Sequence, residues 1–121
     1  MTTPEIIEKP LGKLQIFIKP KDKVKGSSLI GRLTSKQLYR EIVRYAKEDQ
    51  LLNASVYQTH SGYSLDDDIS VRHAELDNSG LALCIELIDA KSRLENFCKK
   101  HAVLLKGKMI VFKAVEFWEI R

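Results

Sequence analysis

The spacing of apolar residues predicts four β-strands. Apolar and polar positions alternate in residues 13–19, which is typical of a half-buried strand, and Pro20 ends this strand. β-branched and aromatic residues predict a second strand at residues 54–60. The nearly continuous apolar run of residues 81–88 is typical of a strand with a covered face, and residues 109–120 predict a long final strand.

Apolar residues at helical spacing predict two helices between these strands. The first helix is expected to begin at Thr34, because Thr34 and Gln37 have the spacing of a capping box, and to end near Asp49. Asp89 is the expected N-cap of the second helix. The apolar stripes consist of Leu38, Ile42, Tyr45 and Ala46 in the first helix and of Leu94, Phe97, Cys98 and His101 in the second.

The order of these elements is β–α–β, a long connection, and again β–α–β. This is the order of the split βαβ, ferredoxin-like arrangement (βαββαβ), an α+β fold with an antiparallel sheet and two helices on one face. Residues 13–121 are expected to form this domain. Residues 1–12 contain Pro4 and Pro10 and are expected to form a flexible N-terminal arm.

Apolar residues occupy both alternating sets of positions in the final strand. A two-layer domain needs only one apolar strand face, so we expect the second face to contact another subunit. One set consists of Ile110, Phe112, Trp118 and Ile120, and the other of Met109, Val111, Val115 and Phe117.

Composition narrows the class of protein without identifying a function. The 121 residues carry a formal charge of +4, and 44% of them are apolar, as in an ordinary soluble domain. No apolar stretch approaches the ~18 residues of a membrane span, and the first residues lack the pattern of a signal peptide. Cys84 and Cys98 are too few for a disulfide scaffold and fit a reducing compartment, so we expect a cytoplasmic protein.

Residues 61–80 form an acidic segment between the two halves of the chain, with five carboxylates and one arginine. The segment is either a long loop or a hairpin extension through residues 69–71. Its central carboxylates are either a solvated loop tip or an acidic surface for a basic partner. These carboxylates belong to Asp66, Asp67 and Asp68.

Residues suited to catalysis or to metal binding are not arranged in a specific motif. His60 and His73 flank the acidic segment, but their spacing matches no metal motif, and no metal is predicted. No serine, cysteine or threonine is combined with a histidine in the pattern of a catalytic set, so the chain is not expected to be an enzyme. The ferredoxin-like order also suggests RNA binding, but residues 81–88 offer no aromatic side chain for base stacking, and no nucleic-acid partner is predicted.

Lys106-Gly107-Lys108 is a predicted turn before the final strand. A glycine lets a ligand approach the backbone closely, and two ammonium groups beside it suit a phosphate. The same tripeptide is also a common connector. The sequence therefore offers an anion site and a plain turn as alternatives.

Three runs of residues resemble one known family. They are LYREIVRYAKEDQLLNASVYQTHSGYS, LALCIELIDAKSRLENFCKKH and the final VEFWEI, and the resemblance covers residues 13–121 with the spacing of every element. The chain resembles the PII-like family catalogued as domain of unknown function 190. This resemblance implies a ferredoxin-like homotrimer with ligand sites between subunits, which regulates by binding and not by catalysis.

The resemblance also implies roles for particular residues. The implied ligand is a nucleotide or another small anionic metabolite, bound by Gly62, Lys106, Gly107 and Lys108, and no cofactor is implied. A loop that follows Gly62 contacts the target protein. Its contact residues are taken as Tyr63, Asp66, Asp67, Asp68 and Arg72. By family analogy the target is a membrane transporter or another protein.

Two other functions remain open at this point. One is a ligand-free interaction module, and the other is a metal-binding or small enzymatic protein of the same fold. The turn before the final strand is shorter than the phosphate-binding loop of PII signalling proteins and holds one glycine. The sequence therefore leaves the identity of the ligand open.

Overall fold

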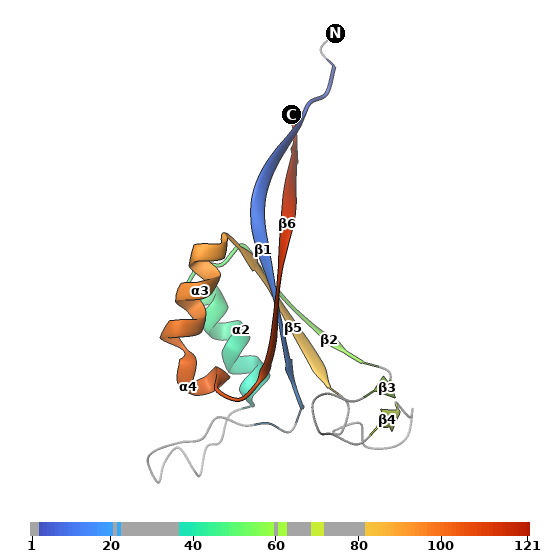
Figure 1. The fold of residues 1–121 in the computed structure, drawn as a ribbon, viewed down its shortest axis with the longest axis vertical. Helices are drawn as coiled ribbons and strands as arrows, with labels where there is room; N and C mark the ends of the chain where they lie inside the picture. The colour runs from blue at the N-terminus through green and yellow to red at the C-terminus, as the bar shows by residue number, and fades with distance from the viewer. Residues whose placement is uncertain (1–2, 21, 23–36, 60, 63–68, 72–81) are drawn as a thin grey trace.

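The computed structural model describes residues 3–20, 22, 37–59, 61–62, 69–71 and 82–121. Its elements in chain order are β1 (Ile6–Ile18), α2 (Leu38–Glu48), β2 (Asn53–Gln58), β3 (Ser61–Gly62), β4 (Ser70–Val71), β5 (Leu83–Asp89), α3 (Lys91–Lys100), α4 (Ala102–Leu105) and β6 (Met109–Ile120) (Figure 1). The predicted strands at residues 54–60, 81–88 and 109–120 correspond to β2, β5 and β6.

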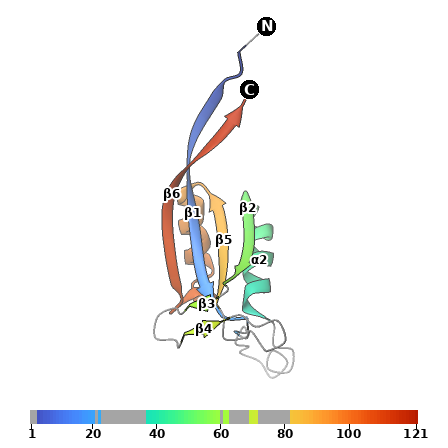
Figure 2. The ribbon, with the colours of Figure 1, turned by 90° about the vertical axis from the view of Figure 1, so that its right-hand side faces the viewer.

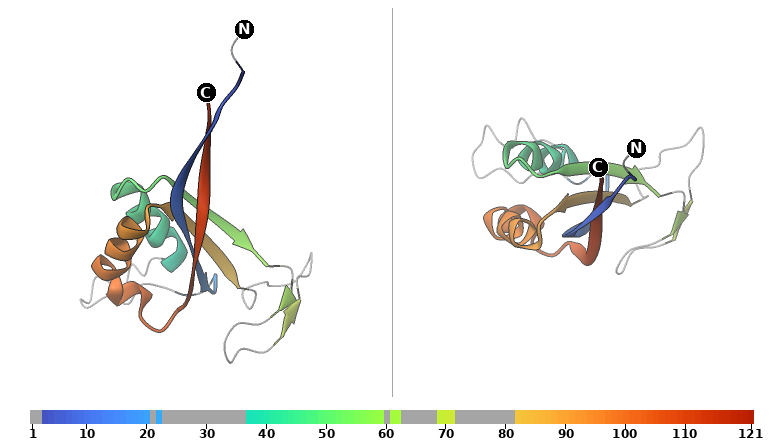
Figure 3. Two further views of the ribbon diagram at one scale, coloured as in Figure 1. Left: turned by 45° about the horizontal axis from the view of Figure 1, so that its top comes forward. Right: turned by 90° about the horizontal axis from the view of Figure 1, so that it is seen from above.

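Strands β2, β5, β1 and β6 form one antiparallel sheet in that order. Helices α2 and α3 lie on the same face of this sheet (Figures 1 and 3). The strand that precedes α2 and the strand that precedes α3 are neighbours in the centre, as the split βαβ arrangement requires. The predicted α+β, ferredoxin-like fold is confirmed.

The hydrophobic core lies between the sheet and the two helices. Alternate residues of β1 face the helices, because successive side chains of a strand point to opposite faces. The buried apolar residues are Leu14, Ile16, Ile18, Leu83, Ile85 and Leu87 from strands and Leu38, Ile42, Ala46, Leu94, Phe97 and Leu105 from helices. The other members of the predicted helical stripes, Tyr45, Cys98 and His101, are half-buried at the edge of the core.

No described helix or strand covers the opposite face of the sheet, which we call the open sheet face (Figure 2). Near its centre, Gln15 Nε2 donates a hydrogen bond of 3.1 Å to Glu86 Oε1. Alternation and strand register also place Cys84, the facing pair Lys13 and Lys113, and eight larger apolar side chains on this face. These eight are Leu11, Phe17, Tyr57, Ile88, Met109, Val111, Val115 and Phe117.

The predicted flexible arm of residues 1–12 is wrong from Ile6 onward. β1 begins at Ile6 and pairs with β6 over twelve residue pairs. β5 joins β1 from Gly12 onward, so Pro10 lies where β6 is the neighbouring strand on one side and no described strand lies on the other. A residue without an N–H is tolerated at such an edge. The backbone groups of the long strand β6 need hydrogen-bond partners, and residues 6–12 supply them although Pro10 lies among these residues.

The outer part of this strand pair is a two-stranded ribbon of residues 6–10 and 116–120, which we call the terminal ribbon. It extends beyond the ends of β2 and β5 (Figure 2). Both ends of the chain therefore lie on the same side of the molecule, away from the helices.

Both predicted helix caps are shifted in the structure. The N-cap of α2 is Gln37, which makes no side-chain capping hydrogen bond, so the predicted capping box with Thr34 is wrong. Thr34 itself lies outside the described residues. The N-cap of α3 is Ala90, one residue after the predicted Asp89.

The acidic segment of residues 61–80 has a hairpin at its base. Ser61 pairs with Val71 and Gly62 pairs with Ser70, so of the two alternatives the hairpin extension is the one found. β3 and β4 lie beyond the ends of β2 and β5, at the end of the sheet opposite to the terminal ribbon (Figure 1). The fold thus separates the β3–β4 hairpin from both chain ends.

The buried carboxylate of Asp89 joins β5, α3 and the turn after α2. It accepts hydrogen bonds from the backbone N–H groups of Leu52 (3.0 Å) and Ala90 (2.6 Å). It also lies 3.1 Å from Arg93 Nη1. Because Asp89 is 3% exposed, its loss removes a buried acceptor that holds two backbone N–H groups in place.

We expect Asp89→Ala to lower the free energy of unfolding by about 3 kcal/mol. Arg93→Ala is the matched control, since it removes the exposed partner and keeps the buried acceptor, and it should cost about 1 kcal/mol or less. Urea unfolding followed by circular dichroism measures both values. Equal losses for the two variants would show that the ion pair, and not the buried acceptor, is what matters.

Candidate functional site

The turn between α4 and β6 has the geometry that the sequence predicts. The Lys106 N–H donates to the Ala102 carbonyl at 2.9 Å, and the Lys108 N–H donates to the Leu105 carbonyl at 3.1 Å. Gly107 has a φ of 79°, in the left-handed region that favours glycine. Lys106 and Gly107 are exposed and Lys108 is half-buried. The turn therefore presents its ammonium groups and an accessible backbone at the surface.

Asp22 ties this turn to the beginning of the fold. Lys108 Nζ lies 3.4 Å from Asp22 Oδ2, and the same oxygen accepts a hydrogen bond of 2.9 Å from the Lys19 N–H. The Asp22 carbonyl accepts a hydrogen bond of 2.9 Å from the Leu38 N–H, at the start of α2. The position of Lys108 is thus linked to the end of β1 and to the first residue of α2, a link that spacing in the sequence does not reveal.

One copy of the chain does not bring Gly62 next to the lysines. The turn before β6 lies below the helices, whereas β3 lies on the other side of the sheet, beyond the ends of β2 and β5 (Figures 1 and 3). Gly62 itself is held in the β3–β4 pair. A ligand that touches both Gly62 and Lys108 therefore has to contact two copies.

The expected target-contact residues cannot be placed relative to this turn. Tyr63, Asp66, Asp67, Asp68 and Arg72 lie outside the described residues, and so do His60 and His73. Within the described ranges, no three histidine, cysteine or carboxylate side chains gather as metal ligands.

A second polar cluster, which the sequence analysis missed, joins the end of α2 to α3. Lys100 Nζ donates to Asp49 Oδ1 at 2.7 Å, and His101 Nε2 lies 2.9 Å from Asp49 Oδ2. The His101 ring stacks on Tyr45, with ring centroids 4.6 Å apart. Arg93 Nη2 donates to the Asp49 carbonyl at 2.6 Å. The cluster connects two helices, and Asp49, Arg93 and Lys100 line a hollow of about 240 Å³ beside it in which both cations already have protein partners.

Hydrogen bonds hold the pKa of the Asp49 carboxyl below its ordinary value, first that from Lys100 and then the contact with His101. No single segment signals this cluster, because Asp49 and His101 are 52 residues apart. In the sequence, His101 belongs to an apolar stripe and Asp49 only marks the end of a helix. Both descriptions are correct, and neither predicts the contact.

The two cysteines have the surroundings of packing residues. Burial raises the pKa of the Cys84 thiol, with a further contribution from Glu86, and burial also raises the pKa of the Cys98 thiol. A thiol with a raised pKa is protonated at neutral pH and is a poor nucleophile. The cysteines thus give no support to a thiol-based reaction.

The family follows from residues 11–117, which match the model of DUF190, described as "Uncharacterized ACR, COG1993". The chain belongs to the DUF190 family. The match covers the whole ferredoxin-like core and includes the turn at Lys106–Lys108.

Solved structures with the same fold are PII-like proteins. CPII from Thiomonas intermedia K12, bound to ADP and bicarbonate, is 12% identical, with a TM-score of 0.54 over 95% of this DUF190 chain and 93% of that chain. CPII bound to ADP, AMP and bicarbonate is 10% identical, with a TM-score of 0.55 over 95% and 92% of the two chains. A putative PII-like signalling protein from Thermus thermophilus is 10% identical, with a TM-score of 0.51 over 93% and 91%.

These similarities establish the PII-like fold of this DUF190 protein. The comparison with curated proteins gave no match. Among the described helices, none has the length and apolar character needed to span a membrane.

The lowered pKa of Asp49 predicts a pH-dependent stability. Because the folded-state pKa lies below the ordinary value of 3.8, Asp49 stabilises the fold above that pH, and this stability is lost as the pH falls through the folded-state pKa. At pH 7 we expect Asp49→Asn to lower stability by about 1 kcal/mol. Thermal unfolding between pH 7 and pH 2 should show this difference shrink toward zero below pH 3.8. A difference that stays constant over this range would contradict the assignment.

Proposed function

We propose that this DUF190 protein is a PII-like regulatory protein that binds a small anionic ligand between subunits of a homotrimer. The ligand is a nucleotide such as ADP or AMP, or another small anionic metabolite. A target protein binds the acidic segment of residues 61–80. The protein acts in the cytoplasm by binding and does not catalyse a reaction.

The observation that carries this proposal is the fold shared with CPII structures that hold ADP, AMP and bicarbonate, over 95% of this chain. The turn at Lys106–Lys108, which we call the lysine turn, also supports it, because its charge and its open backbone suit an anion. The backbone of Gly107 has open space where a side chain would be, and the exposed Lys106 forms no ion pair with a described residue. The N–H groups of Lys106 and Lys108 already donate to the Ala102 and Leu105 carbonyls, so a phosphate or carboxylate would be bound mainly by the ammonium groups.

Lys108 has a partner that an anionic ligand would have to share. Its ammonium group lies beside the Asp22 carboxylate, and both side chains are about 30% exposed (29% and 27%). A phosphate near Lys108 would lie close to this carboxylate as well. Lys106 is therefore expected to contribute the larger part of the attraction to the anion. Lys108 is held in a more fixed position by Asp22.

The open sheet face supports association into a trimer. Tyr57 is 54% exposed and Phe117 is 47% exposed in a single copy, on a face that no described element covers. Large apolar side chains exposed on an uncovered sheet face are typical of a protein–protein interface. We propose that copies arranged around this face bring the Lys106–Lys108 turn of one subunit toward Gly62 of another.

A site shared in this way explains how ligand binding would reach the target. Gly62 lies at the base of the acidic segment, in the β3–β4 pair. A ligand shifts the conformation of a segment only if it binds one conformation more tightly than another. A ligand that touches both Gly62 and the lysine turn meets this condition. The acidic segment suits a basic surface on the target, and we propose a membrane transporter as the target class.

We expect a nucleotide or bicarbonate to stabilise the protein against heat, since a ligand at 100 times its Kd adds about 2.7 kcal/mol. With the best ligand, Lys106→Ala and Lys108→Ala should each weaken binding about 10- to 150-fold, because a hydrogen bond to a charged group contributes about 1.5–3 kcal/mol. Calorimetry at fixed salt measures these values.

Lys47→Ala is the control, since Lys47 is an exposed lysine of α2 and its loss changes net charge by the same amount. It should leave the Kd unchanged within a factor of two. If Lys106→Ala and Lys108→Ala behave like this control, the ligand binds elsewhere. If no nucleotide or anion raises the melting temperature, the protein is an interaction module without this ligand class.

The trimer is tested separately from the ligand. Light scattering at micromolar concentration should give a mass near three times 13.8 kDa. Replacement of Phe117 by Asp on the open sheet face should lower this mass, because it places a charge in an apolar interface. A wild-type mass of one chain would refute the trimer and, with it, a site between subunits.

A further inference from the structure

The terminal ribbon carries an apolar patch bordered by carboxylates. Ile6 pairs with Ile120 and Glu8 pairs with Trp118, and cross-strand partners share a face. Ile6 is 55% exposed, Trp118 57% and Ile120 75%. Trp118 Nε1 also donates to Glu116 Oε1 at 3.2 Å, so the indole and this carboxylate belong to one surface. Three large apolar side chains and two carboxylates thus lie along the terminal ribbon.

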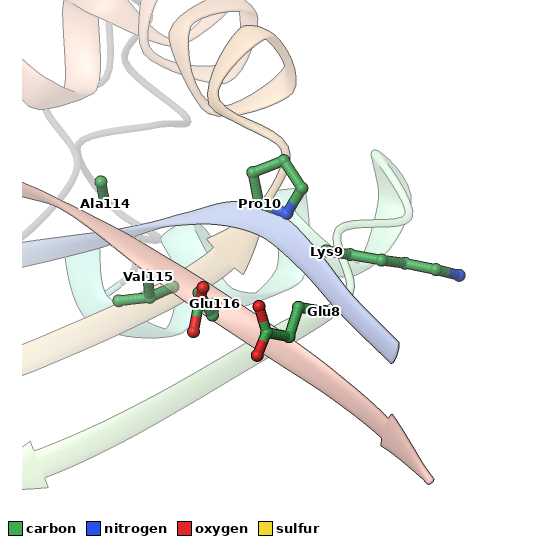
Figure 4. A pocket seen from close by; sticks show the side chains of 6 residues that line it. All are labelled: Glu8, Lys9, Pro10, Ala114, Val115 and Glu116. Carbon is green, nitrogen blue, oxygen red and sulfur yellow. The ribbon is translucent and has the colours of Figure 1, made fainter. Parts of the chain in front are cut away.

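The two carboxylates lie next to each other at the base of the ribbon. Figure 4 shows Glu8 and Glu116 side by side at a hollow of about 430 Å³, which Lys9, Pro10, Ala114 and Val115 also line. Lys9 points away from them and pairs with Glu119 at 3.3 Å. Among the described residues, neither Glu8 nor Glu116 forms an ion pair. Two neighbouring carboxylates repel each other, so this surface favours a partner that brings positive charge.

A groove between α3 and β6 is also apolar, but lysines predominate at its border. Two helices cover four strands, and the edge strand β6 has no described helix above its outer side, so Phe112 remains 40% exposed. The groove has a volume of about 370 Å³ and an apolar lining of Leu14, Leu94, Cys98 and Phe112. It is large enough to accept a further aromatic side chain.

The rim of this groove is positively charged. Lys91, Glu95 and Lys99 follow one another at intervals of four along α3 and line the groove. Lys91 Nζ lies 5.6 Å from the centre of the Phe112 ring, in a cation–π contact. Among the described residues, neither Lys91 nor Lys99 forms an ion pair. The groove thus has an apolar centre and a rim with two lysines and one glutamate, whereas the terminal ribbon has an apolar patch bordered by two carboxylates that form no ion pair with a described residue.

We propose that the terminal ribbon of one copy docks in the α3–β6 groove of a second copy. The apolar side chains of the ribbon, with Trp118 at their centre, fill the groove. Glu8 and Glu116 then meet Lys91 and Lys99 of the second copy. This contact involves neither the lysine turn nor Gly62, so it is independent of the proposed ligand site.

The ribbon cannot fill the groove of its own chain. Phe112 in the groove and Trp118 in the ribbon lie on the same extended strand, and six residues of strand span about 20 Å. The ribbon also points away from the helices (Figure 1). A contact between two different surfaces of identical chains closes into a ring when the rotation allows it. The same contact can therefore repeat around a trimer.

Charge reversal with rescue tests this pairing. Lys91→Glu/Lys99→Glu and Glu8→Lys/Glu116→Lys should each raise the dissociation constant of the assembly about tenfold or more, because like charges then face each other. The variant with all four changes restores opposite charges and should return to within about threefold of wild type. Sedimentation velocity over a dilution series measures these constants, and circular dichroism checks that each variant is folded.

A single-site control separates this contact from a general effect of charge. Lys47→Glu reverses an exposed lysine of α2 that does not line the groove and should leave the assembly unchanged, whereas Lys99→Glu should weaken it. Charge pairs at the rim also predict that added salt weakens the wild-type assembly.

Trp118, the one tryptophan of the chain, gives a second readout. Docked in the groove, its indole should be shielded from acrylamide and emit at shorter wavelength than in the folded Lys91→Glu/Lys99→Glu variant. The proposal is overturned if both double variants assemble like wild type, or if the fourfold variant stays as weak as the double ones. It is also overturned if acrylamide quenches Trp118 equally in wild type and in the groove variant.

Discussion

The antiparallel pairing of β1 with β6 is the interaction on which the rest of this structure depends. It joins the first strand of the chain to the last over twelve residue pairs. Through β1 it connects β6 to the central strand β5, whose residues form the core with α2 and α3. It also brings the lysine turn, at the start of β6, next to Asp22 after the end of β1. The turn, the open sheet face and the terminal ribbon all take their positions from this one pair of strands.

The sequence predicted the elements whose signal is local. The final strand at residues 109–120 has the predicted bounds, and the helical stripes around Ile42 and Leu94 are buried as expected. The prediction failed at residues 6–12, because Pro4 and Pro10 argued for an arm over the first twelve residues. Pairing with a distant strand outweighed them, and this long-range contact leaves no trace in a window of neighbouring residues.

The candidate site was predictable only in part for the same reason. The lysine-glycine-lysine turn and its left-handed glycine follow from three adjacent residues, and the structure has that turn. Its link to Asp22 joins side chains that are 86 residues apart in the sequence. The contact of Asp49 with His101 joins side chains that are 52 residues apart. The proposed contribution of Gly62 requires another copy of the chain. Spacing within one chain cannot reveal contacts of these two kinds.

The central claim is that one ligand contacts the lysine turn of one subunit and Gly62 at the base of the acidic segment of another. Hydrogen–deuterium exchange of the wild-type protein with and without millimolar ADP tests this claim most directly, because it reports on both segments in the intact assembly. The account predicts slower amide exchange at residues 106–109 and at Ser61 and Gly62, in the same titration and with the same midpoint. Slower exchange in only one of the two segments, or in neither, would contradict it.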